Sequence, residues 1–124
     1  MTPLSHPQID DVPLEAVLHA LSDPVRVAIF TQIAAAASPC VCSTFLSVVD
    51  RPIPKSTLSQ HFKALREAGL IRSERHGVEM RNVSRCEEMN ARFPGLLPAI
   101  IDAHQRQACG ARERRARLGG RPSF

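Results

Sequence analysis

The chain contains no tryptophan and no tyrosine, and five phenylalanines are its whole supply of Phe, Tyr and Trp over 124 residues. Readers of single-stranded RNA commonly stack bases on exposed aromatic side chains, so this composition argues against that class. No apolar run approaches the roughly 20 residues that span a bilayer. The start MTPLSHPQIDD lacks the basic and then apolar pattern of a signal peptide. We therefore expect a cytoplasmic protein with no membrane partner, whose four cysteines are mostly reduced thiols.

What the chain does have is a hydrophobic fraction of 44%, enough for the packed core of one domain. Its net charge of +4 is unevenly placed. Residues 51–85 carry eight Lys or Arg against three Glu, and residues 105–124 carry six Arg against one Glu, so each block is +5. Residues 1–50 and 86–104 are net acidic. Localised basic blocks indicate an anionic partner such as nucleic acid, or else a solubilising surface.

Apolar spacing predicts four helices in the first half of the chain. VPLEAVLHALSD has an amphipathic pattern, and SDPVRVAIF offers Ser22 or Asp23 as N-cap with Pro24 in the first helical position. Ser38-Pro39 is predicted to start a third helix. A fourth is expected from about Pro54 to Ala68, with Leu58, Phe62 and Leu65 on its inner face and Gly69 as its C-cap.

Two β-leaning segments, LIRSER and EMRNVSR, flank a His-Gly pair and predict a hairpin, and after Cys86 a short and then a longer helix are expected. The predicted fold class is mainly α with a small β-hairpin wing, a winged helix-turn-helix. We expect a flexible arm at residues 1–11, the winged helix DNA-binding and dimerisation domain at 12–108, and an Arg-rich tail at 109–124.

The fourth helix has the composition of a DNA-recognition helix. Short hydroxyl side chains permit close approach to the groove, Gln60 can pair with adenine and His61 can donate to a base or phosphate. Lys55 and Lys63 would contact phosphates. The same residues also suit an ordinary solvated helix face. The tip of the hairpin, with Arg75, His76, Gly77 and Arg81, lies where a wing would touch DNA.

LSDPVRVAIF followed by KSTLSQHFKALREAGLIRSERHGVEMRNVSR closely resembles the ArsR family of bacterial winged-helix repressors, over roughly residues 12–105. The resemblance implies a homodimer that binds double-stranded operator DNA as a transcription repressor and is released by an inducer. The DNA-contacting positions that it implies are Ser56, Thr57, Ser59, Gln60 and His61, with Arg75 and Arg81 on the wing. Dimerisation in the family uses the first and last helices. Here those helices carry two apolar stripes, Leu14, Val17, Leu18 and Leu21, and Leu97, Ile100 and Ile101.

The inducer has to be argued from possible ligands. Cys40-Val41-Cys42 resembles the CVC of arsenic- and cadmium-sensing members, and soft thiolates suit As(III), Sb(III), Cd(II) or Cu(I). In a helix that starts at Pro39 the two thiols would point about 160° apart, whereas in an extended segment they would share a face. A third thiolate could come from Cys86 or Cys109. The alternatives are a thiol-redox or non-metal inducer, with cysteines that are structural.

Two further sensors are conceivable. Asp102-Ala103-His104 matches half of the zinc site of related sensors, whose later ligand positions are Arg115 and Leu118 here. Cys109 beside the Arg-rich run could be an oxidisable thiol. A different functional class is a protein-interaction winged helix without a DNA target. We expect no enzyme, because neither a base placed beside a cysteine nor a cofactor motif is found in the sequence.

Overall fold

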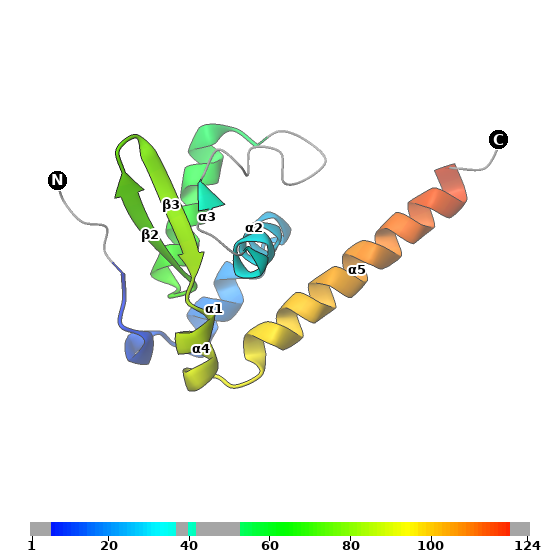
Figure 1. The fold of residues 1–124 in the computed structure, drawn as a ribbon. Coiled ribbons are helices and arrows are strands. Elements are labelled where there is room, and N and C mark those ends of the chain that lie inside the picture. Colours follow the sequence, from blue (N-terminus) through cyan, green and yellow to red (C-terminus); the bar gives the residue numbers. More distant parts are fainter. Residues whose placement is uncertain (1–5, 37–39, 42–52, 120–124) are drawn as a thin grey trace.

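The computed structural model describes residues 6–36, 40–41 and 53–119, in which a small antiparallel sheet stands at one side of the molecule, with helices beside it and at its base (Figure 1). The helices are the 3-10 helix η1 (Ile9–Asp11), α1 (Leu14–Ala20), α2 (Pro24–Ala35), α3 (Lys55–Glu67), α4 (Cys86–Arg92) and α5 (Leu96–Gly119). The strands are β1 (Cys40–Val41), β2 (Ile71–His76) and β3 (Glu79–Ser84), in the order β1-β3-β2. The predicted fold class, mainly helical with a hairpin wing, is confirmed. In this part of the chain no helix is long and apolar enough to cross a membrane.

Local sequence signals set the ends of α2 and α3. The Asp23 side chain accepts hydrogen bonds from the backbone N–H groups of Val25 and Arg26, at 2.8 and 3.2 Å, and Pro24 takes the first helical position. After α3, Gly69 has a φ of +75°, and its N–H donates to the carbonyl of Arg66. Because glycine has no Cβ, it reverses the chain here without strain and leads α3 directly into β2.

The segment around Cys40 differs from the prediction. A helix starting at Ser38-Pro39 would include Cys40 and Val41, but these two residues form β1, which pairs antiparallel with β3. Cys40 lies opposite Asn82, and Val41 lies opposite Arg81. Pairing with a strand 40 residues away in the chain therefore prevails over the local helix signal at these two positions. Cys42 and the rest of the expected third helix lie outside the described residues.

The core is formed where α1, α2 and α3 pack against the sheet and the start of α5. The inner face of α3 is buried as predicted, with Leu58, Phe62 and Leu65 at most 3% exposed. Two residues assigned to the dimer surface are instead in this core: Val17 of α1 is fully buried, and Leu97 of α5 is 1% exposed. An amphipathic stripe indicates burial but does not tell whether its own domain or a partner covers it.

Residues 6–11, expected to belong to a flexible arm, are held against the domain. The backbone N–H of Ser73 donates to His6 Nε2 at 3.0 Å, and the Arg85 side chain donates to the carbonyl of Pro7 at 2.9 Å. The partly buried Ile9 of η1 packs against the core, and Val12 is 2% exposed. This segment is therefore part of the folded domain.

Helix α5 is continuous across residue 108, where the sequence suggested that a tail begins. It runs from Leu96 to Gly119, about 36 Å at 1.5 Å per residue. Its first turns pack against α2 and α4, and its later part extends away from the other elements (Figure 1). The Arg-rich segment up to residue 119 is thus a projecting helix.

Candidate nucleic-acid interface

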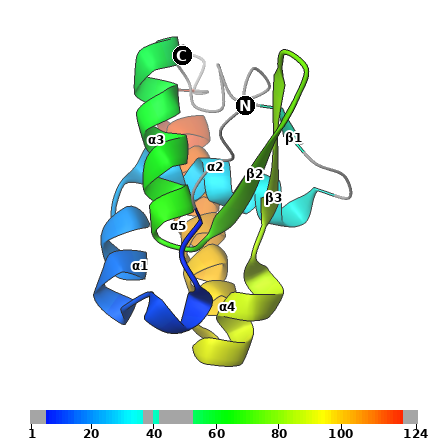
Figure 2. The same ribbon diagram turned by 90° about the vertical axis from the view of Figure 1, so that its left-hand side faces the viewer.

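Helix α3 and the β2-β3 hairpin form one end of the molecule. Figure 2 shows the amino end of α3 and the tip of the hairpin pointing the same way, with α1, η1 and α4 at the opposite end. The turn at Gly69 fixes this arrangement, since β2 starts directly after α3 and packs against it. A recognition helix and a wing need this relative placement to reach one duplex together.

Seven of the nine predicted DNA-contacting residues are exposed at this end. They are Lys55, Ser56, Ser59, Gln60 and Lys63 on α3, and Arg75 and Arg81 on the hairpin. Thr57 and His61 are half-buried, because both lie beside the inner face that carries Leu58 and Phe62. His61 Nδ1 is buried and has no hydrogen-bond partner among the described residues.

The amino end of α3 is suited to an anion. Its N-cap, Pro54, makes no side-chain hydrogen bond, and the first turn contains no acidic residue. The first backbone N–H in α3 with an intrahelical acceptor is that of Leu58, which donates to the Pro54 carbonyl at 2.9 Å. The preceding N–H groups, together with the helix dipole, make this end a favourable place for a phosphate.

The hairpin carries charges of both signs. Arg81 lies 3.4 Å from the carboxylate of Glu79, and His76 lies 3.4 Å from that of Glu74. Arg75, which lies between Glu74 and His76 on β2, is exposed and has no ion-pair partner among the described residues. At the tip, Gly77 has a φ of +64°, and Val78 is 98% exposed. Arg75 is therefore the cation of the hairpin that is most available to an external phosphate.

The base of the hairpin is fixed by a buried arginine. Arg85 is 5% exposed; its guanidinium donates two 3.0 Å hydrogen bonds to Glu88, and its backbone N–H donates to the Leu70 carbonyl. The hydrogen bond from Arg85 holds the pKa of Glu88 below its ordinary value, although partial desolvation of the carboxyl opposes this. Arg72 of β2 adds a weaker contact to Glu88 at 3.7 Å. The ionised carboxylate thus ties α4 to the hairpin.

The sheet connects the candidate sensor residue Cys40 to the wing. Asn82 of β3, which lies opposite Cys40, is fully buried, and its side chain accepts a 2.6 Å hydrogen bond from the Ser73 hydroxyl of β2. A buried polar pair of this kind fixes the register of the two hairpin strands. Cys40 therefore lies directly beside the position in β3 where a side-chain hydrogen bond joins the two strands of the hairpin.

The other predicted thiol ligands lie on separate helices. Cys86 starts α4 and is half-buried, whereas Cys109 is exposed on α5, with its thiol 3.7 Å from a Glu113 oxygen. Within the described residues no cluster of three His, Cys, Asp or Glu side chains could hold a metal ion. Because Cys42 lies outside the described residues, the combination of Cys40 and Cys42 stays a prediction.

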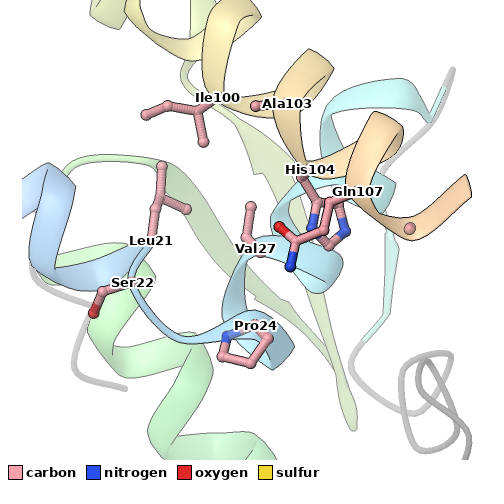
Figure 3. Close-up of a pocket in the computed structure, with 9 residues that line it drawn as sticks. Leu21, Ser22, Pro24, Val27, Ile100, Ala103, His104 and Gln107 are labelled. Atoms are coloured by element: carbon pink, nitrogen blue, oxygen red, sulfur yellow. The ribbon is translucent and has the colours of Figure 1, made fainter. Parts of the chain in front are cut away.

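The Asp102-Ala103-His104 motif lies beside a cavity. Asp102 is exposed and its carboxylate accepts a 2.8 Å hydrogen bond from Arg106, so it is engaged within α5. His104 and Gln107 line an open cavity of about 520 Å³ between α5 and the turn from α1 to α2 (Figure 3). Leu21, Val27 and Ile100 provide its apolar walls. Asp102 is thus engaged with Arg106 while His104 lines the cavity, and the metal site that the motif suggested stays a prediction.

The strand at Cys40-Val41 agrees with the extended alternative that the sequence left open beside a helix. Sequence reasoning missed the Ser73–Asn82 pair and the docking of His6 and Pro7 at the sheet. The β-branched valine between the two cysteines was a weak strand signal. The other two features depend on contacts between distant parts of the chain and have no local signature.

Comparison with known proteins agrees with this geometry. Residues 21–74, from the end of α1 into β2, match a family described as a helix-turn-helix domain. Among solved structures, the chain is similar to an ArsR-like transcriptional regulator from Rhodococcus sp. RHA1, with 25% identity and a TM-score of 0.52 over 85% of this chain and 88% of that one. No curated protein matches significantly. The matched segment contains a helix-turn-helix, and the structural likeness over most of both chains shows that this chain has the winged helix-turn-helix fold of the ArsR-like regulator.

Proposed function

We propose that the protein is a homodimeric transcriptional repressor that binds operator DNA through α3 and the hairpin, and that an inducer acting on cysteine thiols releases it. The observation that carries the DNA-binding part is the exposed polar row on α3 beside a hairpin that exposes Arg75 and Arg81. These elements lie within the basic block of residues 51–85, whereas the sequence on either side is net acidic.

The dimensions of α3 suit the major groove. Its 13 residues span about 20 Å at 1.5 Å per residue, and the groove is about 12 Å wide and admits one helix. Ser56 and Ser59 leave the backbone free to approach closely, and Gln60 projects from the exposed face. A glutamine can donate to N7 and accept from N6 of one adenine, which discriminates against the other bases.

A dimer is favoured by apolar side chains that the domain itself does not cover. Leu14 and Leu18 on α1 remain 39% and 46% exposed. They lie four residues apart, so they share one face of the helix. A two-fold dimer would present two α3 helices to half-sites about 34 Å apart, one turn of the duplex.

The DNA-binding part is tested by selecting duplexes from a random-insert library with the wild-type protein and measuring binding to a selected duplex and to random duplex by fluorescence anisotropy. Gln60→Ala should reduce the preference for the selected duplex by about 5- to 150-fold, the 1–3 kcal/mol of one bidentate base contact. Gln8→Ala, which makes the same chemical change on an exposed residue at the opposite end, should leave the preference unchanged. A protein that selects no sequence would contradict the repressor proposal, and one that also binds no duplex would favour the protein-interaction class.

The proposed inducer site is centred on Cys40 and Cys42. The extended backbone at Cys40-Val41 supports it, because residues i and i+2 of a strand share a face and two thiols can then bind one soft ion. Its position on the strand next to β3 also supports it, since strain at Cys40 would reach the hairpin through the ladder. Cys86 or Cys109 would complete a three-thiolate site for As(III).

Release from the selected duplex by As(III), Sb(III), Cd(II), Zn(II) and peroxide tests the inducer. The wild type should be released by a thiol-binding ion, while Cys40→Ser and Cys42→Ser should stay bound. Loss of release in Cys86→Ser or Cys109→Ser identifies the third thiolate. If both variants at 40 and 42 are released like wild type by every agent, the thiol-pair site is wrong. Release by peroxide alone would favour the redox alternative.

A further inference from the structure

We propose that residues 105–119 of α5 form a second DNA-binding element, which contacts backbone phosphates beside the sequence read by α3. This inference rests on the proposed DNA-binding function and adds a site that α3 and the hairpin do not include. The residues that carry it are the exposed arginines Arg106, Arg114 and Arg117.

The composition of residues 105–119 argues against packing through an apolar face. From residue 105 to 119 Leu118 is the one large apolar residue, and the segment holds five arginines against the single acidic residue Glu113. Stable helix packing needs an apolar stripe, since apolar burial provides most of its free energy. A helix that projects from the domain without such a stripe is suited to a charged partner.

The described arginines line one side of the helix. At about 100° per residue, Arg114 is offset by roughly 80° and Arg117 by roughly 20° from Arg106. The side chain of Arg106 is 80% exposed and forms an ion pair with Asp102. Arg114 and Arg117 are also exposed. From Arg106 to Arg117 the helix rises about 16 Å, which matches the length of about five base steps at 3.4 Å along one strand.

The direction of α5 brings this row toward DNA. In Figures 1 and 2 the carboxyl end of α5 rises toward the same end of the molecule as the amino end of α3 and the hairpin tip, displaced to one side. A duplex bound by α3 that runs toward the side of α5 would therefore pass close to the arginines of this helix. The identity of the cations also fits phosphate. All six basic residues of 105–124 are Arg and none is Lys, and the planar guanidinium binds a phosphate through two parallel hydrogen bonds.

The competing anion is the acidic part of a second copy, residues 1–50, with five Asp or Glu against one Arg. Duplex DNA is favoured because it carries one negative charge per about 1.7 Å of its axis, far denser than five carboxylates over 50 residues. An α5 that bound a second copy would change the oligomeric state when its arginines are removed, and this distinguishes the two partners.

The test uses Arg114→Gln/Arg117→Gln in the full chain, because glutamine is nearly as good a helix former as arginine and both residues are exposed. Binding to a 40-base-pair random-sequence duplex is measured by anisotropy from 50 to 200 mM salt. Loss of two phosphate contacts should reduce the slope of log affinity against log salt by about 1.8. The affinity ratio of wild type to variant then falls about 12-fold across that range.

The matched control is Gln8→Glu/Asn90→Asp, which lowers the net charge by the same two units. Both residues are exposed, Gln8 directly before η1 and Asn90 on α4, and these elements lie at the opposite end of the molecule. Its slope should stay at the wild-type value. Equal slopes in all three proteins, or equal reductions in variant and control, overturn the inference. So does a variant that changes its sedimentation but retains the wild-type slope, which would assign α5 to a second copy.

The two proposals fail separately. A wild-type protein that binds no duplex at all contradicts the proposed function. A wild type that binds duplex and selects a sequence, beside an Arg114→Gln/Arg117→Gln variant with an unaltered salt slope, contradicts only the role of α5. The preference for selected over random duplex should be the same in wild type and variant, because phosphate contacts carry no sequence information.

Discussion

Gly69 joins the recognition helix to the hairpin, and replacing it with alanine tests both the turn and the docking of the amino-terminal segment. A Cβ at Gly69 would lie 2.9 Å from Val12 Cγ2 and 3.3 Å from Ile9 Cδ1. Since Val12 is 2% exposed, it has little space to move. The substitution therefore forces a side chain into a filled core and, at a φ of +75°, into a left-handed conformation.

The two effects can be estimated separately. A left-handed conformation costs a non-glycine residue about 1–2 kcal/mol, and overpacking a core costs about 1–3 kcal/mol. Gly69→Ala should therefore reduce the free energy of unfolding by about 3 kcal/mol. Gly77→Ala is the matched control, because its φ is +64° and a Cβ there would meet nothing within 4 Å. It should cost about 1 kcal/mol, the conformational part alone.

Urea unfolding followed by far-ultraviolet circular dichroism, at one protein concentration, measures both losses. In a Val12→Ala background, which removes the contacting methyl group, Gly69→Ala should cost at least about 1 kcal/mol less than in wild type. Equal losses for Gly69→Ala and Gly77→Ala, or an unaltered loss in the Val12→Ala background, would refute the close packing of the amino-terminal segment on this turn.

Three further experiments probe other parts of the structure. The hydrogen bond from Arg85 lowers the pKa of Glu88 in the folded state below its ordinary value of 4.5. The bond therefore stabilises the fold at pH values above 4.5. This stabilisation disappears as the pH falls through the lowered pKa. Urea midpoints of the wild type should thus fall more steeply with acidification below pH 4.5 than those of Glu88→Gln, and parallel curves would contradict the linkage. Asp23→Ala should lose about 1 kcal/mol of stability, as expected for an N-cap, whereas Asp23→Asn should retain most of it in the same assay. Leu18→Glu should shift the sedimenting species from dimer to monomer, while Val78→Glu, which places the same charge on the still more exposed valine of the hairpin turn, should leave the dimer intact; a dimeric Leu18→Glu would move the interface away from α1.

The parts of the fold that sequence reasoning reached are those with local causes. Asp23 and Pro24 start α2 through contacts within three residues, and the buried positions of α3 follow its 3.6-residue period. Gly69 ends α3 because the backbone there needs a positive φ. The exposed face of α3 followed from the same period, which is why most of its predicted DNA-contacting residues are exposed.

The parts that it missed depend on distant partners. The hydrogen bond from Ser73 to His6 joins residues 67 apart, and the one from Arg85 to Pro7 joins residues 78 apart. Neither histidine nor arginine shows in the sequence which backbone group it will bind. The same limit applied to Val17 and Leu97, whose apolar character was predicted but whose burial in their own domain was not.

Cys40 shows how such a contact changes a functional argument. In a helix, residues two apart diverge by about 160°, so a helix beginning at Pro39 would have separated the thiols of residues 40 and 42. The strand at Cys40-Val41 removes this objection at the described positions and pairs Cys40 with the buried Asn82. Asn82 is hydrogen-bonded to Ser73 on the other strand of the hairpin. A ligand at Cys40 would therefore act first on the hairpin, because β1 pairs directly with β3.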